Sequence, residues 1–79
     1  MDNLRYSVIE NNNHQEKKEK NFEFDKEKAL EYYEARCKEL DKELIGWKKE
    51  NGINSCIWSF EKEFKVLYLQ IDGHENLEF

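Results

Sequence analysis

The side chains best suited to nucleophilic, redox or metal chemistry are Cys37, Cys56, His14 and His74. The two cysteines have neither C-x-x-C spacing nor the density of a disulfide scaffold, which predicts two reduced, buried thiols. A zinc site would need all four scattered residues to converge, and no zinc spacing supports one. The sequence also lacks a Gly-rich phosphate loop, a Walker motif and H-E-x-x-H. We therefore predict no catalytic site, no metal and no cofactor, and expect that the protein is not an enzyme.

Carboxylates gather where a helix is expected to begin. Such a row can present negative charge that imitates phosphates, as inhibitors of nucleic-acid-binding proteins do. The simpler alternative is a solvated face placed favourably toward the helix dipole. The acidic residues predicted to contact a partner are Glu23, Asp25, Glu27, Glu31 and Glu34.

Aromatic and branched residues dominate the segments 53–60 and 64–71, which favours two strands joined as a hairpin. A second helix is the competing interpretation, because the apolar residues also fit helical spacing. With Phe60 opposite Phe64, Trp58 lies beside Val66 on one face of the hairpin. The apolar residues predicted to contact a partner are Trp58, Phe60, Phe64, Val66 and Tyr68.

Both faces of this predicted hairpin are apolar, yet one helix can cover only one face of a sheet. We therefore expect a protein-binding or self-association surface on the second face. One alternative is that another segment of the chain covers it, either the loop over 10–21 or the tail with Leu77 and Phe79. Another is that Trp58 and Tyr68 are simply half exposed.

The remaining elements follow from periodicity and capping. Asp25 is a good N-cap, and an apolar stripe at three- and four-residue steps predicts an amphipathic helix. Gly46 is the exception in this helix, because it marks either an earlier end or a close packing contact. The chain is thus expected to be a single α+β domain over 1–79, with ββαββ order and the helix packed on an antiparallel sheet. The expected elements are a strand over 4–9, a mobile polar loop over 10–21, a short strand over 22–24, a helix from Asp25 to near Asn51, the hairpin over 53–71 and a flexible tail over 73–79.

The net charge limits the classes of molecule that the protein is expected to bind. Eighteen acidic and thirteen basic residues give a formal net charge of -5, which repels bare nucleic acid and anionic lipid and favours neutral or basic partners. No apolar run has the length of a membrane span and the start of the chain lacks a signal-peptide core, so we expect a cytoplasmic protein without membrane contact. Single-stranded nucleic-acid binding remains an alternative, because hairpin aromatic residues beside Lys62 and Lys65 could stack bases.

In size, acidity and lack of catalytic motifs, the chain resembles the small phage and mobile-element proteins that bind and disable a host machine, anti-CRISPR proteins among them. This resemblance is one of character and assigns no residue a role. It implies an inhibitor or regulator that occludes a host protein, which could itself bind nucleic acid. The alternative is a homodimeric structural or regulatory subunit.

Overall fold

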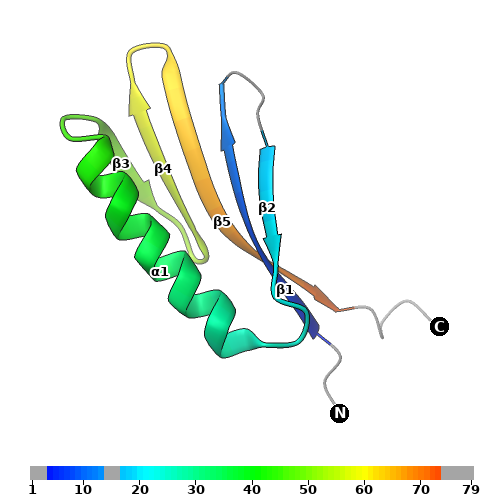
Figure 1. Ribbon diagram of the computed structural model, residues 1–79. Coiled ribbons are helices and arrows are strands. Elements are labelled where there is room, and N and C mark those ends of the chain that lie inside the picture. Colours follow the sequence, from blue (N-terminus) through cyan, green and yellow to red (C-terminus); the bar gives the residue numbers. More distant parts are fainter. Residues whose placement is uncertain (1–3, 14–16, 74–79) are drawn as a thin grey trace.

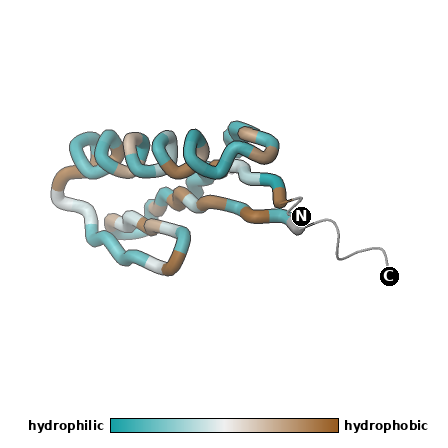
Figure 2. The backbone as a smooth tube through the Cα atoms, turned by 90° about the horizontal axis from the view of Figure 1, so that it is seen from below, coloured by the Kyte–Doolittle hydropathy of each residue, from teal (hydrophilic) through white to brown (hydrophobic). Residues whose placement is uncertain are grey.

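One antiparallel sheet and one helix form the fold in the computed structural model, which describes residues 4–13 and 17–73 (Figure 1). The strand order in the sheet is β2-β1-β5-β4-β3, and the helix lies along one face (Figure 2). The predicted α+β class is confirmed, with one strand more than the predicted ββαββ order. The elements are β1 (Leu4–Asn12), β2 (Lys17–Asn21), α1 (Lys26–Glu43), β3 (Lys48–Asn51), β4 (Ser55–Phe60) and β5 (Glu63–Gly73).

Helix α1 begins where the sequence predicts. The Asp25 Oδ1 atom accepts a hydrogen bond from a backbone N–H of the first turn at 3.1 Å, as an N-cap should. The predicted end near Asn51 is wrong, because the helix ends at Glu43. Gly46 then takes a φ of 92°, a left-handed conformation that favours glycine and turns the chain out of the helix. The last predicted helical turn is strand β3 instead.

The predicted polar loop over 10–21 is wrong for the described residues. Strand β1 continues to Asn12, and β2 pairs with it in antiparallel register. The short strand predicted over 22–24 is wrong as well, because Glu23 has a φ of 57° in the turn that leads into α1. Every residue of β2 is exposed and polar, so this strand lacks the alternation of apolar and polar residues by which a strand is predicted. Two parts of the earlier predictions lie outside the described residues, namely 14–16 of the loop and 74–79 of the tail.

The hairpin predicted over 53–71 is confirmed, and the competing helix is wrong. The closing pair is Phe60 with Glu63, so two residues form the turn, and the first of them, Glu61, has a φ of 56°. The register is therefore shifted by one residue from the predicted pairing of Phe60 with Phe64. Side chains alternate between the two faces along a strand. A β4 residue and the β5 residue that was predicted to lie opposite it therefore point to opposite faces of the sheet.

The core lies between α1 and the sheet. On the helix, Ala29 and Leu40 are fully buried, and they belong to the same cluster as the fully buried Leu67 on β5. The predicted apolar stripe of α1 is confirmed, because its partly buried members pack against the same cluster. Removing these side chains from water is the main stabilising contribution of such a small domain. The buried cluster contains Tyr6, Val8, Ala29, Leu40, Cys56, Trp58, Leu67 and Leu69.

Candidate protein-binding face

Side chains of β5 alternate between the two faces of the sheet. Leu67 and Leu69 point toward α1 and are buried in the core, so Val66 and Tyr68 point to the other face. No helix covers that second face in the described part of the chain, as Figure 2 shows. We call it the open face, and its apolar residues are Ile9, Ile57, Phe64, Val66 and Tyr68.

The apolar side chains of the open face form neighbouring cross-strand pairs. Ile57 lies opposite Val66, and Tyr68 lies opposite Ile9 on β1. Ile57 and Phe64 keep 40% and 41% of their surface exposed, whereas Ile9 keeps 1%. The exposed apolar side chains of the open face therefore lie on the β4–β5 hairpin, next to a buried position on β1. Pairs of this kind stabilise the sheet and leave apolar surface available to a partner.

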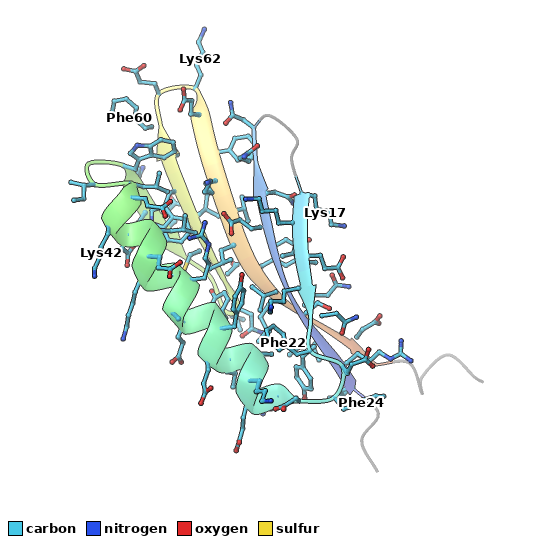
Figure 3. All side chains as sticks on the ribbon, viewed as in Figure 1. Lys17, Phe22, Phe24, Lys42, Phe60 and Lys62 are labelled. Atoms are coloured by element: carbon cyan, nitrogen blue, oxygen red, sulfur yellow. The ribbon has the colours of Figure 1, made fainter. Side chains whose placement is uncertain are left out.

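Two of the predicted contact residues lie on the helix side instead. Trp58 is 1% exposed beneath α1, where its indole Nε1 donates a hydrogen bond to Asp41 Oδ1 at 3.0 Å. It is therefore no surface anchor in this fold, and the predicted pairing with Val66 is wrong. Phe60, labelled in Figure 3, lies on the same side as Trp58. The centroid of its ring is 5.9 Å from that of the Trp47 ring. The open face thus keeps three of the five predicted residues, namely Phe64, Val66 and Tyr68.

Charged edge strands border the sheet on both sides. Every residue of β2 and β3 is exposed. Lysines on an edge strand discourage pairing with a further strand, because that pairing would desolvate their charges. A partner is therefore expected to meet the open face and not to extend the sheet. The lysines on these two edges are Lys17, Lys18, Lys20, Lys48 and Lys49.

The predicted acidic row is exposed, but it lies away from the open face. Glu27, Glu31 and Glu34 project from α1, while Asp25 caps the helix and Glu23 lies in the turn before it. Because α1 covers the opposite face of the sheet, the row and the open face lie on opposite sides of the domain (Figure 2). One flat partner surface cannot contact both.

A groove of about 570 Å³ lies between α1 and strands β1 and β2. In it, the Arg36 guanidinium hydrogen-bonds the Glu10 carboxylate and holds the pKa of that carboxyl below its ordinary value. Lys18 and Lys20 of β2 also line the groove, and the Lys20 Nζ atom lies 5.5 Å from the centre of the Tyr32 ring. Sequence reasoning missed this groove because the segment that forms β2 was predicted to be a loop. The Arg36 guanidinium in this groove is already paired with Glu10 and Glu39, so we assign the groove no ligand.

Comparison with known proteins adds no assignment. No family model, no curated protein and no solved structure matches the chain. Within residues 4–13 and 17–73, no three Cys, His, Asp or Glu side chains are grouped to hold a metal ion. No helix in those ranges is both long and apolar enough to cross a membrane. His14 and His74 lie outside the described residues.

Proposed function

We propose that the chain is a small, non-enzymatic protein-binding module whose open face docks on a partner protein. One observation carries the proposal: Ile57 and Phe64 are 40% and 41% exposed, on neighbouring strands of a face that no described helix covers. Covering such side chains yields about 25 cal/mol for each Å² of apolar surface removed from water. The charged edges of the sheet leave this face as the favourable place for contact.

The partner we propose is a separate folded protein with a neutral or positive net charge. The chain carries a net charge of -5, which attracts a basic partner and opposes a second copy of itself. The main core lies between α1 and the sheet and contains no residue of the open face. The protomer therefore buries its core without a partner. Obligate dimers, in contrast, bury large and mostly apolar interfaces. These properties favour a partner that binds and dissociates.

Binding itself would be the activity. A compact domain seated on the working surface of a host protein blocks that surface sterically, which makes the chain an inhibitor or regulator by occlusion. This is the mode of action expected of phage and mobile-element proteins that disable a host defence. In this arrangement the acidic row attracts a basic partner from a distance without touching it.

Nucleic acid is the less favoured partner. Of the two lysines in that alternative, Lys62 and Lys65, Lys65 lies on the helix side, with its Nζ atom 3.6 Å from Glu10 Oε2. It therefore cannot accompany bases stacked on Phe64 and Tyr68 across the sheet.

Phe60 and Phe64 provide a matched pair for the experiment. Both lie beside the hairpin turn and are 48% and 41% exposed, but they face opposite sides of the sheet. A photoreactive phenylalanine analogue would be placed at position 64, and separately at position 60, in cells of the source organism. The protein captured from position 64 alone is then purified and titrated with the wild-type chain, with Phe64→Asp and with Phe60→Asp. Circular dichroism confirms that each variant is folded.

We expect Phe64→Asp to weaken binding by about tenfold or more, and Phe60→Asp to leave it nearly unchanged. Equal affinities for the two variants would overturn the proposal. So would capture of a second copy of the chain, together with a dimer in light scattering, because that result assigns the open face to self-association. A salt-sensitive complex with single-stranded nucleic acid at position 64 would overturn it in favour of the nucleic-acid alternative.

A further inference from the structure

Two cysteines that are distant in the sequence meet beneath the helix. The Sγ atom of Cys37 on α1 lies 3.2 Å from the Sγ atom of Cys56 on β4, and both are free thiols. Cys56 is 5% exposed, whereas Cys37 is only partly buried and can be reached from solvent. Because a disulfide bond is about 2.05 Å long, the two sulfur atoms need to approach by only about 1 Å.

Polar groups surround the inner thiol. The Cys56 Sγ atom donates a hydrogen bond to Asn51 Oδ1 at 3.2 Å, and the Tyr33 hydroxyl lies 3.5 Å from the same sulfur. These contacts hold the Cys56 side chain in one position beside its partner. A fixed neighbour reacts more readily than a thiol of a disordered chain, because less conformational freedom is lost when the bond forms.

The outer thiol is protonated at neutral pH. Burial, together with the contact with Cys56, raises the pKa of Cys37 to about 11. The charge of Lys49 works in the opposite direction, and that of Asp41 adds to the increase. Thiolate is the reactive form, so this pair should react slowly at pH 7 and faster in alkaline solution. Such a pair responds to a sustained change in redox conditions and not to a brief pulse.

We propose that Cys37 and Cys56 are a redox-modification site, at which a small-molecule disulfide such as oxidised glutathione crosslinks α1 to β4. The Cys37 thiolate attacks one sulfur of the small disulfide, which forms a mixed disulfide and releases one thiolate. The Cys56 thiolate then attacks Cys37 Sγ and releases the second. The two protein thiols lose two protons and two electrons, and the small disulfide becomes two thiols.

The crosslink would hold the helix on the sheet in the arrangement already present. It closes the chain between Cys37 and Cys56, so it restricts the unfolded state more than the folded one. It also fixes β4, whose Ile57 belongs to the open face, but the inference does not depend on what that face binds.

The test titrates the full chain with mixtures of oxidised and reduced glutathione at a mildly alkaline pH, once in native buffer and once in concentrated urea. Free thiols are blocked by alkylation, and mass spectrometry counts the species. We expect a monomer lighter by two hydrogen atoms, without bound glutathione. In native buffer, half-oxidation should need a ratio of oxidised to reduced glutathione about tenfold or more lower than in urea. Cys37→Ala and Cys56→Ala should stop at a mixed disulfide or remain reduced.

Half-oxidation at the same ratio in native buffer and in urea would overturn the proposal, because the fold would then give the pair no advantage. A wild-type product that is mainly a glutathione adduct or a crosslinked dimer would overturn it too. Thermal unfolding provides the structural readout. The oxidised chain should melt at a higher temperature than the reduced chain, and a lower melting temperature would show that the bond distorts the fold.

Discussion

Arg36 of α1 and Glu10 of β1 form a two-pronged salt bridge that joins the helix to the sheet. The Arg36 Nε and Nη2 atoms each lie 2.9 Å from a different oxygen of the Glu10 carboxylate. The two side chains are 18% and 11% exposed, and Lys65 approaches the same carboxylate at 3.6 Å. Paired, partly buried charges of this kind are stronger than exposed ones, and each is costly to leave alone. This contact is therefore the best electrostatic candidate for stabilising the fold.

The substitution Glu10→Gln should lower the free energy of unfolding by about 1–2 kcal/mol, because Arg36 and Lys65 then face a neutral amide. Urea unfolding at pH 7 measures the change. Glu39→Gln is the matched control, since Glu39 also binds Arg36 but its side chain is 63% exposed. That variant should lose less than about 0.5 kcal/mol. Equal losses for the two variants would contradict the distinction between the buried and the exposed pair.

Acid should remove the same contribution. The hydrogen bond from Arg36 lowers the pKa of Glu10 below the ordinary value of 4.5, so the folded state takes up this proton less readily than the unfolded state. The contribution is complete above that ordinary value and is lost as the pH falls through the lower, folded-state pKa. We therefore expect the stability difference between wild type and Glu10→Gln to shrink below pH 4.5. Urea midpoints at several pH values test this, and a difference that stays constant into acid would count against it.

Trp58 and Phe64 test the assignment of the two faces. Trp58 is 1% exposed and loses both core packing and a hydrogen bond to Asp41 in Trp58→Leu, which should cost about 2–4 kcal/mol. Phe64 is 41% exposed on the open face, so Phe64→Leu should cost less than about 1 kcal/mol. Chemical unfolding of both variants gives the comparison. A reversed order would mean that the open face, not the helix side, holds the main core.

The sequence was sufficient where local chemistry and tertiary structure agree. Asp25 caps the helix as its side chain predicts, and the apolar stripe of α1 faces the core. The hairpin over 53–71 also forms, because branched and aromatic residues suit a sheet that is covered on one side. These features depend on near neighbours in the chain, and those neighbours are visible in the sequence.

Other features depend on partners that the sequence does not reveal. Strand β2 has only polar residues and exists because β1 offers an edge to pair with. Strand β3 pairs in the same way with β4 once Gly46 has ended the helix early. The face of the sheet to which Trp58 points depends on the hairpin register. That register is set by a turn in which Glu61 has a left-handed conformation. A shift of one residue was therefore enough to move a predicted contact residue into the core.

The acidic row gives a kinetic prediction. Neutralising its three members on α1 in Glu27→Gln/Glu31→Gln/Glu34→Gln changes the net charge from -5 to -2, since three negative charges are removed. The row lies on the helix side, away from the open face, so it should act only from a distance. The association rate with a basic partner should fall several-fold at low salt, while the dissociation rate stays nearly constant. Surface plasmon resonance separates the two rates, and a faster dissociation would show direct contact.

Two backbone positions with positive φ should respond in opposite directions to substitution. Gly46 has a φ of 92°, and an added Cβ atom would meet nothing within 4 Å, so Gly46→Ala tests the backbone conformation alone. We expect it to cost about 1 kcal/mol. Glu61 has a φ of 56° without being glycine, and asparagine tolerates this conformation better, so Glu61→Asn should gain up to about 1 kcal/mol.

Thermal and urea unfolding of these two variants would show whether the turns are as strained as their φ values indicate. A stabilised Gly46→Ala would mean that the chain continues as a helix past Glu43, as the sequence alone suggested. In that case β3 would be lost, and β4 would become an edge strand with Trp58 near it. A destabilised Glu61→Asn would mean that the hairpin turn has another shape. The register that separates Trp58 from the open face would then have to be different, because the length and type of the turn fix the pairing.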